Sequence, residues 1–392
     1  MTESTNPLNV LIAGGGTAAL EASLALRELA GDRVATTLLA PDADFVYRPM
    51  RVREPFAGPA ARRYPLAAFA RDAGVELRRD AFKWLDPSRH TVHTQAGAEL
   101  SYDALLLAMG ARLEPCFRYA ITLDDRRLDE QLHGLIQDIE GGYVHRLAFI
   151  ARSPMAWPLP LYELALMTAR RAYEMNEDAA VTIVTPEDSP LAVFGDEASR
   201  AVQKLLNDAG IQFASSAYVQ TPHQGEVTLH PDGRCLHVDR VVALPALCGP
   251  STPGVPKHDG HGFISVDPLC RVRGLKNVFA AGDATDFPVK LGGIAAQQAD
   301  IAAAGIATLA GVEVESQAWK PELHAVLLGG EEPLYLSAHV TGEHGSSSIA
   351  TTAGDFSTGA KIAAKYLGPY LEARDRDEPL ASVLSATEAG KG

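Results

Sequence analysis

The sequence contains few cysteines, and no two of them form a recognisable pair. Four occur among 392 residues, at Cys116, Cys235, Cys248 and Cys270. None of the intervals has the spacing of a C-x-x-C redox motif or of zinc ligands. A disulfide-stapled miniprotein is therefore excluded, no metal site is expected, and the thiols should be reduced, as in a cytoplasmic protein.

Long apolar runs and positive charge are also scarce. No stretch approaches the roughly 18 uninterrupted apolar residues of a transmembrane helix. The polar segment 1–7 lacks the basic start of a signal peptide. The 49 acidic residues outnumber the 35 basic ones, and the net charge of −14 disfavours nucleic acid and anionic membranes as partners. We therefore expect a cytoplasmic protein that binds neither.

Strand and helix patterns alternate along the chain, which predicts an α/β fold. The composition, 46% hydrophobic and 21% charged residues, is that of a globular protein of two or three domains. Strands are predicted at 8–13, 34–39, 75–77, 90–94, 103–109, 146–151, 181–185, 211–214, 241–244 and 277–283. Helices are predicted at 17–31, 61–73, 161–175, 196–209 and 294–309.

A glycine turn follows the first strand. Gly14-x-Gly16-x-x-Ala19 satisfies the dinucleotide fingerprint and leads through Thr17 and Ala18 into a helix. Gly14 permits the tight turn, Gly16 lets the backbone approach a pyrophosphate, and Ala19 allows close contact between helix and strand. The start of the helix is therefore predicted to bind a pyrophosphate.

The acidic residue that usually binds the ribose at the end of the second strand is missing. Ala40 occupies its place. Asp42 or Asp44 can substitute for it, and the alternative for both is a solvated turn.

Two later motifs carry a family resemblance. Segments 102–110 (YDALLLAMG) and 277–283 (NVFAAGD) resemble, with the glycine turn, the signatures of FAD enzymes with two dinucleotide domains, the pyridine nucleotide-disulfide oxidoreductase superfamily. Segments 45–49 (FVYRP) and 284–300 resemble the branch of sulfide:quinone oxidoreductases, flavocytochrome-type sulfide dehydrogenases and type II NADH dehydrogenases. The resemblance implies two Rossmann-like dinucleotide-binding domains, the second inserted in the first, plus a C-terminal interface segment.

This resemblance divides the chain into five parts. They are an FAD-binding domain in two pieces (1–115 and 267–317), a degenerate NAD-binding-like domain (116–266), the interface segment (318–374) and a flexible tail (375–392).

The resemblance also implies FAD as the cofactor. Asp283 would bond the FAD phosphate or ribityl chain, and Gly292 and Gly293 would begin a helix at the pyrimidine edge of the flavin. Lys290 would stabilise negative charge on the reduced flavin. The alternatives are a turn residue for Asp283 and a surface lysine for Lys290. Further residues matched to the cofactor are Arg48, Pro49, Ala108, Met109, Gly110 and Gly282.

The second domain lacks its own glycine turn. Its first strand leads into residues 152–163, which contain Pro154, Pro158 and Pro160 but no glycine. Proline removes the N–H donors of a phosphate cradle, and Trp157 can fill the place of a nicotinamide cofactor. The segment therefore argues against NAD(P)H.

The reactive groups of the branch are also incomplete. Its sulfide enzymes use two cysteines beside the flavin, whereas here Cys116 alone can approach it. Glu163 matches a glutamate that faces the flavin and is a candidate proton relay. The alternative for Glu163 is an acid in the first helical turn.

The C-terminal segment 359–371 has an amphipathic face, formed by Ile362, Tyr366, Leu367 and Tyr370. We expect a short helix, broken by Gly368-Pro369, that packs on the flavin domain or across a homodimer.

Three functions are consistent with these features. The first is a sulfide:quinone oxidoreductase-like enzyme that passes electrons from a small-molecule reductant through FAD to a quinone or an electron-carrier protein. The second is an NAD(P)H-dependent flavin reductase. The third is an FAD-binding partner subunit or biosynthetic protein without independent turnover.

Overall fold

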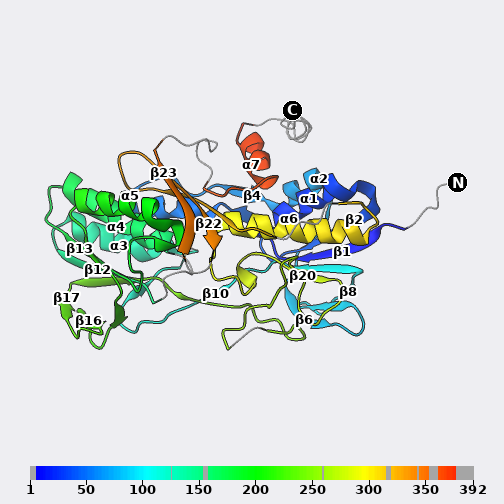
Figure 1. Ribbon diagram of the computed structural model, residues 1–392, viewed down its shortest axis with the longest axis horizontal. Helices are drawn as coiled ribbons and strands as arrows, with labels where there is room; N and C mark the ends of the chain where they lie inside the picture. The colour runs from blue at the N-terminus through cyan, green and yellow to red at the C-terminus, as the bar shows by residue number, and fades with distance from the viewer. Residues whose placement is uncertain are drawn as a thin grey trace.

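Two five-stranded parallel sheets form the framework of the computed structural model (Figure 1). The structure describes residues 6–124, 126–152, 158–257, 260–314, 319–341, 344–352 and 361–376. The first sheet has the order β20-β9-β1-β2-β5. Its strands are β1 Leu8–Ala13, β2 Val34–Leu39, β5 Glu76–Arg78, β9 Ala104–Leu107 and β20 Val278–Ala280.

The second sheet lies within the interval between β9 and β20. Its order is β11-β18-β12-β13-β14, again with parallel neighbours. The strands are β11 Ile121–Thr122, β12 Arg146–Ile150, β13 Ala180–Val184, β14 Gln212–Ala214 and β18 Arg240–Ala243. The accompanying helices are α3 Leu128–Glu140, α4 Leu159–Glu174 and α5 Gly195–Asp208. The predicted α/β fold, with one dinucleotide-type domain inserted in the other, is confirmed.

Two alanine-rich helices pack against each other on the first sheet. They are α1, Thr17–Ala30, and α6, Gly292–Leu309. Their shared core cluster contains Ala22, Ala25, Ala299, Ala302 and Ala303. Alanine favours the helix and lets two helices approach closely. The first domain thus joins segments that precede and follow the second domain in the chain (Figure 1).

Several predicted boundaries are wrong. The helix predicted at 61–73 begins at Leu66, because residues 63–65 form β4 and pair with β3, Asp44–Val46. Pro65 occupies the position before this helix, α2 (Leu66–Ala73), where its missing N–H breaks no helical bond. Helix α4 begins earlier than predicted, at Leu159, and holds Pro160 in its first turn.

Antiparallel strands complete the two domains. They are β6 Phe82–Asp86, β7 Thr91–Thr94, β8 Glu99–Ser101, β10 Arg112–Glu114, β15 Tyr218–Gln220, β16 Glu226–His230, β17 Cys235–His237 and β19 Ala246–Cys248. The pair β10–β19 consists of the two segments that connect the domains. After this pair, Val255 and Ile264 pack in one cluster with Leu11 and Leu105 of the first sheet. Residues 255 and 264, which lie within the predicted range of the second domain, therefore contribute to the core of the first.

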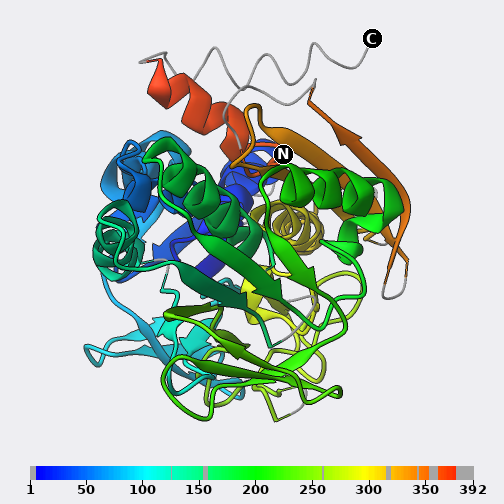
Figure 2. The same cartoon turned by 90° about the vertical axis from the view of Figure 1, so that its left-hand side faces the viewer.

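The C-terminal part contacts both domains. Strands β21 Glu322–Leu327, β22 Leu334–Thr341 and β23 His344–Thr351 form a sheet whose Leu323 and Leu336 join the core cluster of the second domain. Helix α7, Leu367–Asp375, packs instead with α1. Figure 2 shows this sheet and α7 on the same side of the molecule.

The amphipathic C-terminal face packs on the first domain. This is one of the two arrangements that we predicted, the other being packing across a homodimer. Ile362, Tyr366, Leu367 and Tyr370 are all buried in its core cluster. The predicted break is wrong, because the helix starts at Leu367 and accommodates Pro369 in its first turn. Residues 377–392 of the predicted tail lie outside the described residues. Within the described ranges, no helix has both the length and the apolar character needed to cross a bilayer.

Buried hydrogen bonds fix the segment that precedes α7. The Ile362 N–H donates to the hydroxyl of Tyr47 over 3.0 Å. The N–H groups of Tyr366 and Leu367 donate to the carboxylate of Glu21 on α1, over 2.9 and 2.5 Å. Because these groups are buried, each amide depends on its partner for a hydrogen bond.

Removing the Tyr47 hydroxyl should therefore destabilise the fold. In Tyr47→Phe the buried Ile362 amide loses its acceptor, and we expect the free energy of unfolding to fall by about 1–3 kcal/mol. Tyr143→Phe is the matched control, because Tyr143 is 80% exposed. Urea denaturation of both variants measures the difference. Equal midpoints for the two variants would contradict the contact.

Candidate active site

The glycine turn after β1 touches the end of β9. Gly14 has a φ of +136°, and its N–H donates to the Leu39 carbonyl over 2.9 Å. A Cβ atom at Gly14 would lie 2.2 Å from the carbonyl oxygen of Ala108. Glycine is thus required by both conformation and space. This contact brings the predicted cofactor residues 108–110 beside the turn.

The start of α1 has the features of a phosphate cradle. Gly16 is the N-cap residue, and a Cβ built on it would meet nothing within 4 Å. The first amides of a helix have no intrahelical acceptor, so those at the start of α1 are available to an anion. Thr17 begins the helix, and the next two helical residues, Ala18 and Ala19, are buried. The open space at Gly16 fits the predicted pyrophosphate.

A second turn lies between the starts of α1 and α6. It is the short 3-10 helix η4, Gly282–Ala284, and Gly282 has a φ of +76°. A Cβ at Gly282 would lie 3.3 Å from the Cβ atoms of both Ala18 and Ala295. Asp283, which is partly exposed, is the second residue of this turn, whose first residue packs against both helices.

Helix α6 begins at Gly292, as the family resemblance implied and two residues before the start predicted from the sequence pattern. A Cβ at Gly292 would lie 2.8 Å from Cγ1 of Ile362, and one at Gly293 would lie 3.4 Å from the Ala363 carbonyl oxygen. The C-terminal segment thus covers the first turn of α6. The absence of a side chain at Gly292 permits this approach, whereas the contact at Gly293 is of ordinary van der Waals length.

Lys290 is buried next to the same turn. It is 5% exposed, its Nζ donates to the Thr285 carbonyl over 2.6 Å, and it lies 4.2 Å from the ring centroid of Phe263. Burial lowers the pKa of Lys290 to about 8, although Asp283 and Asp286 oppose this shift. The alternative of a surface lysine is wrong.

Glu163 forms an ion pair that the sequence did not predict. Its Oε1 lies 2.5 Å from Nζ of Lys361, and the two side chains are 1% and 3% exposed. The same oxygen accepts the Leu328 N–H over 2.9 Å, and Lys361 also donates to the Pro49 carbonyl over 3.1 Å. Burial raises the pKa of Glu163 despite the ammonium beside it. The alternative of a first-turn acid is wrong, because α4 begins four residues earlier, at Leu159.

The remaining predicted residues come from other segments of the chain. Asp42 is exposed in a turn, and Asp44 lies 3.9 Å from the guanidinium of Arg63. Cys116 is half-buried, with its thiol 3.5 Å from the Leu244 carbonyl, and burial raises the pKa of that thiol. A higher pKa disfavours the reactive thiolate. Arg48 begins the 3-10 helix η2, Arg48–Phe56, which also contains Pro49.

An acidic residue at the carboxyl end of the second sheet is buried inside the protein. Glu187, shortly after β13, is 3% exposed and accepts hydrogen bonds from the hydroxyls of Tyr162 and Thr185. Tyr162 is completely buried on α4. Burial raises the pKa of Glu187 to about 7. The predicted obstruction by Trp157 lies outside the described residues, because 153–157 are not among them.

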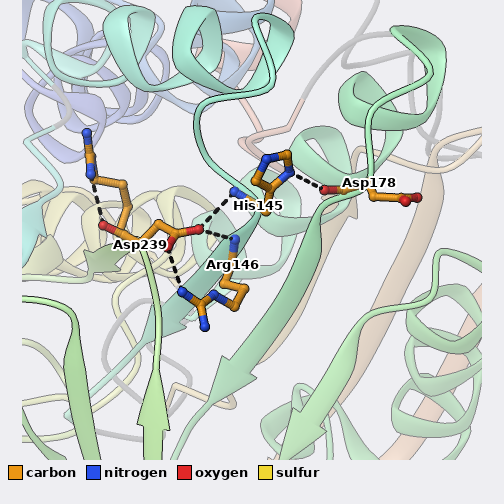
Figure 3. Close-up of polar contacts among 5 residues, drawn as sticks. His145, Arg146, Asp178 and Asp239 are labelled. Carbon is orange, nitrogen blue, oxygen red and sulfur yellow. Dashed lines mark hydrogen bonds and ion pairs between the residues drawn. The ribbon is translucent and has the colours of Figure 1, made fainter.

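At the amino end of the second sheet, Asp239 connects β18 with β12 through hydrogen bonds (Figure 3). Its carboxylate accepts the N–H groups of His145 and Arg146 over 2.9 and 2.8 Å and the Arg146 guanidinium over 3.0 Å. The His145 ring lies 3.0 Å from the Asp178 carbonyl.

Two clefts lie away from the glycine turns in the part of the chain that the structure describes. One, of about 450 Å³, lies beside His145 and Asp178, and the other, of about 650 Å³, lies between segment 267–279 and the end of α6. Dinucleotides bind at the carboxyl ends of parallel strands, so neither cleft is assigned as the site.

Four residues at these sites had escaped prediction: Lys361, Thr285, Gln298 and Glu187. Glu187 follows the second strand of its domain, where a ribose-binding acid is expected, and this position was a usable signal. Lys361 is 198 positions from Glu163, and no local pattern reveals such a pair.

Comparison with known proteins agrees with this architecture. Residues 162–306 match the family model described as pyridine nucleotide-disulphide oxidoreductase. An NADH dehydrogenase-like protein of Mycobacterium tuberculosis (strain CDC 1551 / Oshkosh) is 26% identical over 291 residues, which cover 70% of this chain and 72% of the relative. A chloroplastic/mitochondrial monodehydroascorbate reductase of Arabidopsis thaliana is 25% identical over 56% of this chain and 45% of the relative.

Solved structures are similar in fold. The sulfide:quinone oxidoreductase of the hyperthermophilic bacterium Aquifex aeolicus gives a TM-score of 0.76 at 19% identity, covering 88% of this chain and 86% of that one. An NAD-dependent persulfide reductase from A. fulgidus gives 0.60 at 18% identity, covering 84% and 64%. The chain is thus similar to pyridine nucleotide-disulphide oxidoreductases over residues 162–306 and to sulfide:quinone oxidoreductase in fold, and together with the curated relatives these matches support an FAD-dependent oxidoreductase.

Proposed function

We propose that this enzyme passes electrons from a small-molecule reductant to a quinone or another electron carrier, and that its second domain does not bind NAD(P)H. The observation that carries the proposal is the inward-facing pair Tyr162–Glu187. In a working dinucleotide domain, a glycine turn after the first strand and an acid after the second face the ligand. Here residues 152–163 contain no glycine, and Glu187 is buried against Tyr162 and Thr185.

The FAD would lie along the first sheet. In this proposal the first amides of α1, from Gly16 onward, hold the pyrophosphate, and Asp283 contacts the phosphate or the ribityl chain. Asp42 is the proposed ribose contact. The other proposed cofactor contacts are Thr17, Ala18, Ala19, Arg48, Pro49, Ala108, Met109, Gly110 and Gly282. When bound, FAD supplies an isoalloxazine ring that takes up electrons from a donor and delivers them to an acceptor.

Two positive groups would face the pyrimidine end of the ring. The first turn of α6 presents the amides of Gly292 and Gly293 at the positive end of its dipole. Lys290 lies just before this helix and is buried, where a charge acts more strongly than in water. Both groups would stabilise negative charge there.

Glu163, paired with Lys361, would act as a proton donor and acceptor near the flavin. Ile362, the residue after Lys361, packs directly on Gly292. The pair is therefore held close to the first turn of α6. In this buried contact the Glu163 carboxyl would take up or release the proton, beside the Lys361 side chain to which it is hydrogen-bonded. We assign no role to Cys116, because burial raises the pKa of its thiol. We place the enzyme in the cytoplasm, because all four cysteines are free thiols.

Two glycine variants test the proposed cradle. Gly14→Ala should lower the free energy of unfolding by about 2–4 kcal/mol, through an unfavourable φ and a clash with Ala108. Gly16→Val should leave folding nearly unchanged, because its side chain enters open space, but should abolish FAD binding. Urea unfolding and FAD titration of the apoprotein separate the two effects. Full FAD occupancy in Gly16→Val would contradict the role of the turn.

Breaking the buried ion pair should be costly. Lys361→Met leaves the Glu163 carboxylate buried without its cation and should lower the free energy of unfolding by about 3–5 kcal/mol. The double variant Glu163→Leu/Lys361→Met should recover much of this loss. Arg170→Met is the control, because its pair with Glu174 on the same helix is exposed and should contribute less than about 1 kcal/mol. Similar losses for Lys361→Met and Arg170→Met would refute the argument.

The donor can be identified by an anaerobic titration. NADH, NADPH, sulfide and other small reductants are added to separate samples of the holoenzyme while the oxidised-flavin absorption band is followed. We expect the nicotinamides to leave the band unchanged and a small reductant to bleach it. Calorimetry with NAD⁺ provides a readout that needs no turnover. Rapid bleaching by NADH would contradict the proposal and support an NAD(P)H-dependent reductase.

A further inference from the structure

We infer that Gln298 is the positioning residue of the turn that carries Asp283. This inference rests on the proposed FAD site, since it assigns a residue behind that site. Gln298 lies on α6 and is completely buried. Its Oε1 accepts the N–H of Gly282 over 2.7 Å. A side chain on the helix therefore fixes the first residue of the turn.

Thr285 completes the fixation from the other end of the turn. Its hydroxyl donates to the Gly282 carbonyl over 2.9 Å, and Nε2 of Gln298 lies 3.3 Å from that hydroxyl oxygen. These three contacts form a closed ring. The Gly282 N–H donates to Gln298, the Gln298 amide donates to Thr285, and the Thr285 hydroxyl donates to the Gly282 carbonyl.

The ring explains why an amide side chain is needed at this position. The buried N–H of Gly282 depends on Gln298 for its acceptor, whereas the Gly282 carbonyl accepts the main-chain N–H of Thr285 over 3.0 Å as well as its hydroxyl. A glutamine supplies one acceptor and one donor at the distance of the turn, whereas leucine supplies neither. The carbonyl of Thr285 in turn accepts Nζ of Lys290. Gln298 is thus linked through Thr285 to Lys290, the residue proposed to stabilise negative charge on the flavin.

The preceding residue is also a glutamine but has a different environment. Gln297 donates from Nε2 to the Glu322 carbonyl over 2.7 Å. Its Oε1 accepts the indole N–H of Trp319 and the Glu322 N–H, over 3.2 and 3.1 Å. Gln297 therefore joins α6 to the C-terminal sheet, away from Gly282. The chain itself supplies a control of the same residue type on the same helix.

The test is a double-mutant cycle on FAD affinity. Dissociation constants of FAD are measured by fluorescence for the apoproteins of the natural chain, Gln298→Leu, Gln297→Leu, Asp283→Ala and Gln298→Leu/Asp283→Ala. We expect Gln298→Leu to weaken binding by about tenfold or more, and Gln297→Leu by less than about threefold. In the Asp283→Ala background, Gln298→Leu should cause little further loss, because it acts through the same turn.

Three outcomes would overturn the inference: unchanged affinity in Gln298→Leu, equal losses in the two glutamine variants, or the same loss with and without Asp283. A purely structural role of Gln298 would give the last of these. If Gln298→Leu does not fold, as urea unfolding of the apoprotein shows, Thr285→Val removes the hydroxyl from the ring and enters the cycle in its place. Failure of the natural chain to bind FAD would refute the proposed function, and this inference with it.

Discussion

The first domain depends on the close approach of three chain segments that carry small residues. Gly14 touches the carbonyl of Ala108, and Gly282 fits between Ala18 and Ala295. These contacts bring the turn after β1, the end of β9 and the turn after β20 to one point. Side chains larger than methyl would separate α1 from α6. The proposed cofactor site therefore exists only because these positions lack bulk.

The C-terminal segment fixes the relation between this site and the rest of the chain. Lys361 contacts Glu163 from the second domain and Pro49 from the first, while the next residue lies on the first turn of α6. Glu21 then holds the amides at the start of α7. A single stretch of backbone thereby joins both domains at the place where the flavin ring is proposed to lie. Charged groups are buried there because each has a partner of opposite charge or a hydrogen-bond donor.

The sequence was most informative where the determinants are local. The glycine turn, the start of α6 at Gly292 and the second domain without a glycine turn could all be predicted from short segments. The burial of Lys290 could not, because Phe263, which covers it, comes from a separate loop. The partner of Glu163 was missed because it is distant in the sequence. The start of the helix predicted at 61–73 was wrong because residues 63–65 pair with β3.

The insertion of the second domain has a consequence for biosynthesis. Strand β20 and helix α6 follow the entire inserted domain in the chain, yet they complete the sheet and cover the alanine face of α1. During translation, the second domain thus emerges from the ribosome before the first can close. Until then, the apolar face of α1 in the N-terminal part of the first domain remains exposed. Exposed apolar surface of this kind favours aggregation and the binding of chaperones. The order of synthesis therefore completes the second sheet before the first, although Leu323 and Leu336 of the C-terminal sheet join the core of the second domain later.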